Sequence, residues 1–181
     1  MISNIIQKIM KHETLTENEA FYFMEKLANG DVTDAQGSSV LSIMSFRGET
    51  IDEIVGFVKA IRKLSRAADS SQHGELMDTC GTGGDGASTF NISTAVSIIL
   101  ASLGVKVAKH GNKAITSKSG SSDVLEALGI GAASNHFEAN SQLNKHDIAF
   151  LHAPYFHPAL KKVASLRGQL PFRTIFNCIG P

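Results

Sequence analysis

The feature that most constrains this chain is a change in its apolar periodicity near residue 75. Before that point, apolar residues follow the i, i+3, i+4, i+7 pattern of amphipathic helices. After it, the strand-like runs ELMDTC, VKVAKH and IAFLHA alternate with helical segments. Such alternation implies crossover connections and a parallel sheet. We therefore expect an α/β fold class, with a small N-terminal helical domain over residues 1–70 and a mostly parallel α/β domain over residues 75–181.

Three helices of the first domain open with the same local signal, a capping box. A threonine is followed three residues later by a glutamate or glutamine, and the two side chains satisfy free backbone N–H groups reciprocally. The pairs are Thr16 with Glu19, Thr33 with Gln36, and Thr50 with Glu53. Gly30 and Gly48 stand where glycines commonly end helices. The apolar stripes of these helices predict core packing or dimer contacts rather than a ligand site.

The α/β part predicts a ligand site at one edge of its sheet. Loops that follow parallel strands gather at the carboxyl edge, where ligands bind in such folds. Three motifs fall on these loops: GTGGDG, KHGN and HAPYFHP. The helix predicted over residues 91–104 is nearly apolar, so we expect it to be well buried.

The glycine-rich loop GTGGDG is the most informative of these motifs. Its glycines let the backbone approach a ligand closely, and successive N–H groups can form an anion nest. The next helix begins near Asn91, and its free N–H groups and dipole also favour an anion. Side chains of the NIST run add donors and oxygens for a divalent cation. The loop therefore predicts a phosphate site.

By spacing, the same loop also fits the G-x-G-x-x-G fingerprint of dinucleotide sites. That alternative is disfavoured because the helix begins several residues too late. The second strand also ends in Lys109 and His110 rather than in the acidic residue that would hold a ribose. A glycine turn without a ligand stays open as the other alternative.

Lys109 and Ser121 each allow two interpretations. A lysine at a strand end beside a phosphate nest is a natural second clamp, whereas a lone lysine is usually solvated at the surface. The hydroxyl-rich loop before Ser121 opens a helix, and a serine there either caps the helix or holds phosphate.

Composition narrows the classes of protein. Seventeen basic residues balance seventeen acidic ones, and this zero net charge argues against a dedicated nucleic-acid binder. The spacing of Cys80 and Cys178 suggests neither a disulfide framework nor a zinc module. The N-terminus lacks the pattern of a secretory signal, and no apolar run approaches the roughly 18 residues of a membrane span. We expect a cytoplasmic protein.

The run from Asp78 to Gly129 closely resembles the anthranilate phosphoribosyltransferases. The motifs GTGGDG, NIST and KHGN occur in the family's order, and the likeness continues through HAPYFHPAL and RTIFNCIGP. It covers about residues 75–181, and the capped helices fit the family's small helical domain. The resemblance implies a sheet domain of the nucleoside phosphorylase/phosphoribosyltransferase type and a homodimer formed through the N-terminal helices.

The resemblance also implies a reaction. 5-Phosphoribosyl 1-diphosphate and anthranilate give N-(5-phosphoribosyl)anthranilate and diphosphate, a step of tryptophan biosynthesis. The amine attacks the anomeric carbon as diphosphate leaves, so catalysis is mainly positioning and charge stabilisation. Mg²⁺, a hard oxygen-seeking cation, would stabilise the leaving group. No residue is assigned as nucleophile or base, and Cys80 is expected to pack at its strand.

Site residues follow from the resemblance by position. The substrate-binding set is Gly81, Gly84, Asp85, Thr89, Asn91, Ile92, Ser93, Thr94, Lys109, His110, Gly111, Asn112, Lys113, Ala114, Ile115, Thr116, Ser117, Ser121 and Arg167. Ser93 would touch Mg²⁺. Gly81, Asn112 and Arg167 would hold anthranilate, and the Arg167 guanidinium suits its carboxylate, although a surface ion pair is the alternative. The aromatic channel would be lined by His110, Ala153, Pro154 and His157.

One departure and two rival families bear on activity. Family members continue past this C-terminus and carry an adjacent Asp-Glu pair for a second magnesium, which has no counterpart in residues 75–181. We therefore expect weak or absent catalysis from the 181 residues alone. A pyrimidine-nucleoside phosphorylase would use inorganic phosphate and a nucleoside, and KHGN with TFNIST favours the transferase. A non-catalytic nucleic-acid-binding relative would need a basic groove and degraded motifs.

Overall fold

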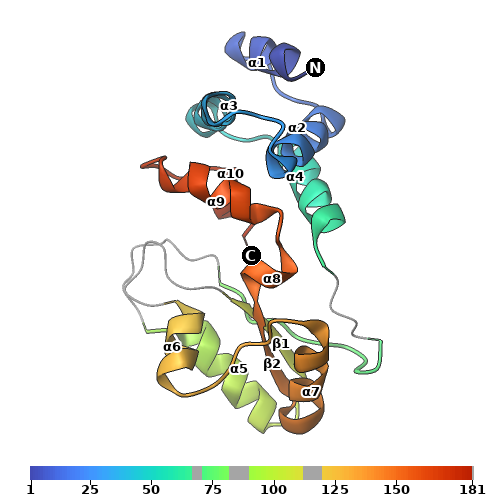
Figure 1. Ribbon diagram of the computed structural model, residues 1–181. Helices are drawn as coiled ribbons and strands as arrows, with labels where there is room; N and C mark the ends of the chain where they lie inside the picture. Colours follow the sequence, from blue (N-terminus) through green and yellow to red (C-terminus); the bar gives the residue numbers. More distant parts are fainter. Residues whose placement is uncertain (67–70, 82–89, 112–119, 181) are drawn as a thin grey trace. The chain divides into compact units, whose positions relative to one another are not determined.

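The computed structural model describes residues 1–66, 71–81, 90–111 and 120–180 (Figure 1). The chain divides into two compact units. The helical unit contains Met1–Ser65 and His157–Pro181, and the α/β unit contains Arg66–Phe156. The chain thus leaves the helical unit after Ser65 and returns to it at His157.

The first four helices of the helical unit are α1 (Ile2–Met10), α2 (Glu17–Asn29), α3 (Asp34–Arg47) and α4 (Ile51–Leu64). All three predicted capping boxes are confirmed, because each threonine hydroxyl accepts the N–H three residues on and each acidic or amide side chain accepts the threonine N–H. Gly30 and Gly48 end their helices with φ of 82° and 87°, the left-handed region that favours glycine.

Two later helices, α9 (Leu160–Gly168) and α10 (Ile175–Cys178), complete the helical unit. Their side chains Val163, Leu166, Ile175 and Phe176 belong to the same buried cluster as α1–α4. Polar contacts fix them further, since Lys162 Nζ donates to the carbonyl of Asn29 and Ser45 Oγ donates to the carbonyl of Arg173.

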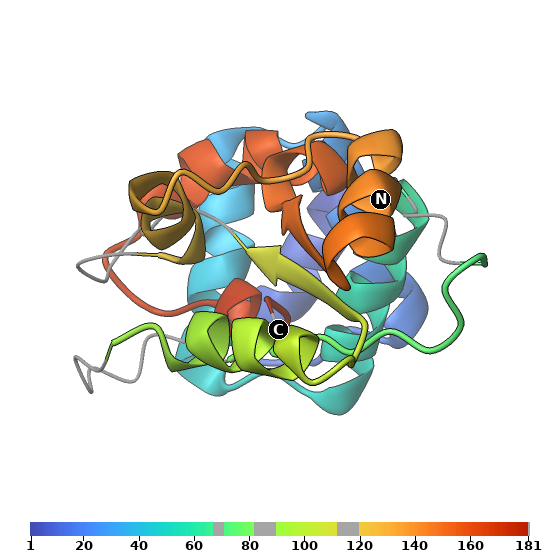
Figure 2. The ribbon, with the colours of Figure 1, turned by 90° about the horizontal axis from the view of Figure 1, so that it is seen from below.

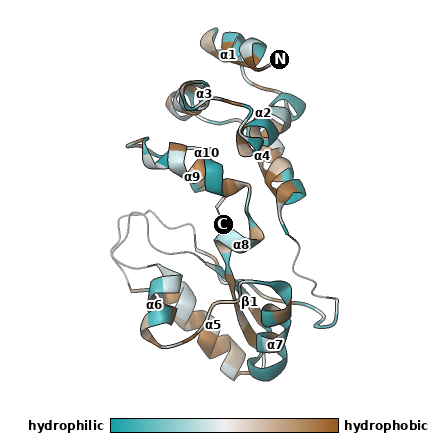
Figure 3. Cartoon of the chain, in the orientation of Figure 1, coloured by the Kyte–Doolittle hydropathy of each residue, from teal (hydrophilic) through white to brown (hydrophobic). Residues whose placement is uncertain are grey.

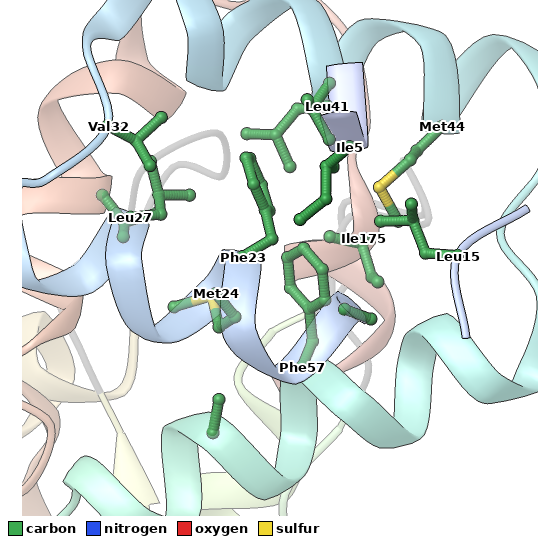
Figure 4. Packing of buried hydrophobic residues seen from close by; sticks show 14 of the residues in the cluster. Ile5, Leu15, Phe23, Met24, Leu27, Val32, Leu41, Met44, Phe57 and Ile175 are labelled. Carbon is green, nitrogen blue, oxygen red and sulfur yellow. The ribbon is translucent and has the colours of Figure 1, made fainter. Parts of the chain in front are cut away.

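An aromatic cluster lies at the centre of the helical unit (Figure 4). Phe57 of α4 lies between Phe23 and Phe176, with ring centroids 6.1 Å and 5.9 Å away. All three rings are buried. Fully burying such a side chain stabilises a fold by about 1.5–3 kcal/mol, so each of the three rings contributes to the stability of the unit.

Glu53 is a buried carboxylate with three donors. Oε1 accepts from the N–H of Leu15 at 2.8 Å and from the Arg47 guanidinium at 2.6 Å, and Oε2 accepts from the N–H of Thr50 at 2.9 Å. Because a buried charge is costly unless it is paired and hydrogen-bonded, these contacts explain how the carboxylate is accommodated. They join the segment before α2 to both α3 and α4.

The sheet of the α/β unit is parallel, as predicted. Strand β1 (Val107–Gly111) pairs with β2 (Ile148–His152) in parallel, with Val107 opposite Ile148 and Gly111 opposite His152. Met77 forms an isolated parallel bridge to Val107, and Ala133 forms one to Leu151. The run ELMDTC, predicted as a strand, is therefore reduced to one bridge beside β1.

The described helices of the α/β unit are α5 (Ile92–Ser102), α6 (Ser121–Ala127), α7 (His136–His146) and α8 (Ala153–Phe156). Figure 2 shows α5 and α7 on opposite sides of the two strands. The prediction that the apolar segment over 91–104 is well buried is wrong. Only Thr94 and Ser97 of α5 are buried, because the helix turns its polar residues toward the sheet.

No helix within the described residues combines the length and the apolar character that a membrane crossing needs.

Candidate functional site

The candidate site lies at the carboxyl edge of the sheet, where three segments meet at Thr79. The Thr79 hydroxyl donates to the carbonyl of Ser93, at the start of α5, at 2.8 Å. Its own carbonyl faces Lys109 Nζ of β1 at 3.5 Å. The segment before the glycine-rich loop, the start of α5 and the end of β1 are thereby held together. The sequence interpretation did not include Thr79, although a polar residue ending a strand before a glycine loop is a signal for it.

Lys109 is buried, with a relative exposure of 2%. The alternative of a solvated surface lysine is therefore wrong. Among the described residues no carboxylate lies within ion-pair distance of Lys109, and the Thr79 carbonyl is a long contact. Because a buried ammonium is costly without a strong partner, the site is suited to an anion.

The end of β1 and the start of α6 meet at a close approach. A Cβ at Gly111 would lie 2.9 Å from Cβ of Ser121, so only glycine fits without movement. Lys109, Gly111 and Ser121 also line one small crevice together with Leu125 and Phe150. Two of the predicted phosphate contacts, Lys109 and Ser121, are thus neighbours in space.

Ser121 does not cap its helix. The N-cap of α6 is Gly120, whose N–H donates to Asp123 Oδ2 at 2.7 Å. The capping interpretation of Ser121 is therefore wrong. Ser121 lies beside Gly111 at the end of β1. Asn91 Nδ2 donates to the carbonyl of Gly120 at 3.5 Å, which brings the starts of α5 and α6 together.

The start of α5 also carries an unpaired buried hydroxyl. Within the part of the chain that the structure describes, Thr94 Oγ1 is buried without a hydrogen-bond partner. Because buried hydroxyls are normally paired, this atom is a candidate ligand contact. Ile92 begins the same helix, and its side chain is exposed.

Ser93 is the residue to test as a magnesium ligand. Its Oγ lies 3.1 Å from the position of a Cβ at Gly81, so the hydroxyl stands beside the first glycine of the loop. No group of three or more His, Cys, Asp or Glu that could hold a metal occurs in residues 1–66, 71–81, 90–111 and 120–180. Mg²⁺ commonly keeps several waters and binds through few protein oxygens plus substrate phosphates, so one hydroxyl beside a phosphate loop fits such a site.

Part of the predicted set lies outside the described residues. These positions are Gly84, Asp85, Thr89, Asn112, Lys113, Ala114, Ile115, Thr116 and Ser117. The remaining members in the α/β unit are Gly81, Asn91, Ile92, Ser93, Thr94, Lys109, His110, Gly111 and Ser121. The structure places Gly81 beside Ser93 and Gly111 beside Ser121, and Thr79 links Ser93 to Lys109.

Arg167 belongs to the helical unit, on α9, and joins none of these described contacts. Its guanidinium lies over the Phe176 ring, 5.2 Å from the centroid, and burial lowers its pKa. In the described part of the chain no carboxylate pairs with it, so the surface ion pair is not found there. A half-buried guanidinium of this kind is suited to bind the carboxylate of an acidic ligand.

The residues predicted for the aromatic channel are split between the units. His110 belongs to β1, and Ala153 and Pro154 start α8, whereas His157 begins the second helical segment. Burial lowers the pKa of His157, which favours the neutral imidazole. Desolvation raises the pKa of the Cys80 thiol, with the charge of Asp78 as a smaller cause, so Cys80 is a poor nucleophile.

Two family models match the chain. The glycosyl transferase family a/b domain matches residues 73–181, and the glycosyl transferase family helical bundle domain matches residues 3–65.

Curated relatives share half of the residues. Anthranilate phosphoribosyltransferase of Geobacillus thermodenitrificans is 50% identical over the whole chain, which covers 53% of that protein. The Bacillus caldotenax enzyme of the same name is also 50% identical over the whole chain, which covers 74% of it. The chain thus spans about half the length of several curated relatives that it matches.

Solved structures agree with the fold. Anthranilate phosphoribosyltransferase from Thermus thermophilus is 37% identical with a TM-score of 0.87, over 98% of this chain and 54% of that one. The Saccharomyces cerevisiae enzyme in complex with PRPP and Mg is 27% identical with a TM-score of 0.83, over 99% of this chain and 54% of that one.

Proposed function

Because the chain belongs to the anthranilate phosphoribosyltransferases of the glycosyl transferase family, we propose that it serves the transfer of a phosphoribosyl group from 5-phosphoribosyl 1-diphosphate to the amine of anthranilate. Diphosphate is the second product, and the reaction belongs to tryptophan biosynthesis. Residues 75–181 would carry the diphosphate-sugar site.

The buried ammonium of Lys109 is the observation that carries this proposal. It faces the Thr79 carbonyl just before the glycine-rich loop, and no carboxylate pairs with it in the described residues. A diphosphate or ribose phosphate bound at this edge would place negative charge beside this ammonium. Hydrogen bonds between ionised partners are about twice as strong as neutral ones, so the lysine would contribute strongly to affinity.

The starts of α5 and α6 extend the same site. Thr94 Oγ1 and the Ser121 hydroxyl offer neutral donors, and Ser93 offers an oxygen to Mg²⁺. Bound there, Mg²⁺ would supply charge stabilisation to the departing diphosphate. The backbone N–H groups of the glycine-rich loop, with Gly84, Asp85 and Thr89, and the residues from Asn112 to Ser117 complete the phosphoribosyl contacts by resemblance.

Arg167 would hold the carboxylate of anthranilate. Its partly buried guanidinium stacks on Phe176, which restricts the orientation of its donors. A planar guanidinium binds a carboxylate bidentately, and an aromatic acid adds stacking surface.

Two further proposals concern assembly and location. The chain would form a homodimer through its N-terminal helices, where Phe46 of α3 and Ile51 of α4 are 88% and 79% exposed. Large exposed apolar side chains are typical of interaction surfaces. A cytoplasmic location accords with Cys80 and Cys178, which are both free.

Binding of the diphosphate sugar tests the proposal directly. Titration of the 181-residue chain with 5-phosphoribosyl 1-diphosphate and Mg²⁺, followed by calorimetry, should give saturable binding. Lys109→Met removes the ammonium and keeps the buried stem, and it should weaken binding by about 10- to 100-fold, as loss of a charged hydrogen bond of about 1.5–3 kcal/mol implies.

Lys106→Met is the matched control, because Lys106 precedes Lys109 on the same segment and pairs with Asp147 at 2.8 Å. It should leave affinity within about twofold, as an exposed ion pair contributes little. Equal affinity of the Lys109 variant and the parent chain contradicts the proposal. Loss of anthranilate fluorescence, compared with the Geobacillus thermodenitrificans enzyme at equal concentration, measures the residual turnover.

A further inference from the structure

Thr79 contacts two different elements of the α/β unit through its two oxygens. Its hydroxyl donates to the carbonyl of Ser93 on α5 at 2.8 Å, and its own carbonyl faces Lys109 Nζ of β1 at 3.5 Å. The side chain of Thr79 is partly buried, so water competes only partly for these contacts. One residue therefore sets the start of α5 against the end of β1.

The backbone before Thr79 is fixed by parallel pairing with β1. The N–H of Met77 donates to the carbonyl of Lys106 at 3.0 Å, and the carbonyl of Met77 accepts from the N–H of Ala108 at 2.9 Å. Continued for two residues, this register puts Thr79 beside Lys109. Thr79 is thus held on β1 just before the chain enters the glycine-rich loop.

Helix α5 has no charged side chain with which to fix its start. Neither its first nor its last turn carries an acidic or basic residue, and the sequence ISTAVSIILAS contains none. Figure 3 shows the helix mainly in the colours of apolar residues. Hydrogen bonds join its start to neighbouring segments instead. The Thr79 bond has an ordinary length for a hydroxyl donor, whereas the contact of Asn91 with the Gly120 carbonyl is long, at 3.5 Å.

The two residues that Thr79 joins have different roles in the proposed function. Lys109 supplies the buried ammonium, and Ser93 supplies an oxygen to Mg²⁺. Thr94, next to Ser93, carries the hydroxyl that is buried without a partner in the described residues. A magnesium-bound diphosphate needs the metal ligand and the ammonium at a set separation, because Mg²⁺ demands near-ideal octahedral geometry. The position of α5 relative to β1 therefore matters for both.

We propose that Thr79 is a positioning residue that couples the Mg²⁺ ligand of the site to its lysine. The hydroxyl fixes the start of α5 relative to β1, so Mg²⁺ and the diphosphate sugar each strengthen the binding of the other. The inference rests on the proposed function and adds to it a residue that acts through Ser93 and Lys109. A purely structural hydroxyl would contribute to stability and leave this coupling unchanged.

Binding with and without Mg²⁺ tests the coupling. Calorimetric titration of the 181-residue chain with 5-phosphoribosyl 1-diphosphate, first with a chelator and then at saturating Mg²⁺, gives the gain in affinity that the metal produces. Thr79→Val removes the hydroxyl and keeps a β-branched side chain of similar volume. It should reduce the gain by about three- to tenfold, the factor that one neutral hydrogen bond is worth.

Rescue and control variants separate the hydroxyl from the shape of the side chain. Thr79→Ser keeps the hydroxyl and should restore the gain to within about twofold of the parent chain. Ser102→Ala is the matched control, because it removes a hydroxyl that donates to the Ile99 carbonyl at 2.7 Å, at the other end of α5. It should leave the gain unchanged. Thr79→Ala is a second variant without the hydroxyl, should Thr79→Val fail to fold.

Amide hydrogen exchange gives a second readout that needs no ligand. Thr79→Val should speed exchange of the Ser97 amide and of its neighbours in the first turns of α5, because their local opening becomes easier. Thr79→Ser should leave this exchange as in the parent chain. Exchange along α7 should be the same in all three chains.

The outcomes distinguish this inference from the proposed function. If the parent chain binds the sugar and Thr79→Val shows the same gain from Mg²⁺ and the same exchange in α5, the inference fails and the proposed function stands. If Thr79→Ser loses the gain as Thr79→Val does, the hydroxyl is not responsible and the inference also fails. If the parent chain does not bind the diphosphate sugar, the proposed function fails and the inference fails with it.

Discussion

The helical unit and the α/β unit bury their apolar residues to very different extents. The helical unit encloses large side chains such as Phe23, Met24 and Phe57. The buried cluster of the α/β unit consists mainly of small residues, Ala133, Ala139 and Ala149 with Leu143. Its most apolar helix, α5, leaves Ile99 and Leu103 exposed. The difference teaches that the described residues of the helical unit enclose a core of large side chains, whereas those of the α/β unit leave more of their apolar surface exposed.

The largest expected effect comes from truncating the centre of the helical core. Phe57→Ala should lower the free energy of unfolding by about 3–5 kcal/mol, because replacing a buried phenylalanine loses burial and leaves a cavity. Ile99→Ala in α5 should change it by less than about 0.5 kcal/mol in the isolated chain, as exposed positions do. Urea unfolding followed by circular dichroism measures the free energy of unfolding of both variants. Equal decreases in the two variants would contradict the contrast between the units.

A second test concerns close packing of α2 against α4. A Cβ at Gly56 would clash with the backbone carbonyl oxygen of Glu17, so Gly56→Ala should destabilise the helical unit by about 1–3 kcal/mol through overpacking. Gly168 of α9 has open space around it. Gly168→Ala should be neutral or stabilising by up to about 1 kcal/mol, because alanine is the better helix former. Thermal melts of both variants measure the change in stability. A loss of stability in both variants would contradict the packing argument.

The units should respond alike to loss of a helix cap. Thr33 caps α3 in the helical unit, and Asn135 Oδ1 accepts from the N–H of Glu138 at 2.9 Å to cap α7 in the α/β unit. Thr33→Ala and Asn135→Ala should each cost about 1 kcal/mol, since capping is local and does not depend on the size of a core. Denaturant unfolding measures the loss of stability in each variant. A much larger loss in one unit would show that the packing of its helix against the rest of that unit depends on the cap.

The smallest effect is the pH response of His157. Its pKa is lowered by burial from the ordinary value of 6.5, so the unfolded chain binds a proton more readily than the folded one. The stabilising contribution of the neutral ring is complete above pH 6.5 and is lost as pH falls through the lower folded pKa. His157→Gln should reduce the loss of stability that occurs as pH falls below 6.5, which thermal melts at several pH values measure. If the dependence of stability on pH is unchanged in the variant, groups other than His157 cause it.

Local signals were sufficient to predict much of this fold. The capping boxes at Thr16, Thr33 and Thr50 depend on residues three positions apart, so the sequence identifies these helix starts. Strand β1 was recognisable from the β-branched residues of VKVAKH, and β2 from the apolar run IAFLHA. The place of Lys109 beside the first loop follows from parallel pairing, since neighbouring parallel strands end at the same edge.

Long-range facts were not predictable in the same way. The exposure of α5 depends on what covers it, and apolar composition alone suggested burial. The cap of α6 is Gly120 with Asp123, a pairing that the serine-rich sequence obscured. The position of Arg167 in the helical unit follows from the return of α9 to the core, which periodicity cannot reveal.

That return has a consequence for synthesis of the chain on the ribosome. Helices α1–α4 emerge first, but Val163, Leu166, Ile175 and Phe176 of their core are made only after the whole α/β unit. Domains generally fold as units while the chain grows, and contacts between distant residues form late. The nascent helices therefore stay incomplete, with apolar surface open to chaperones, until translation has passed Phe176.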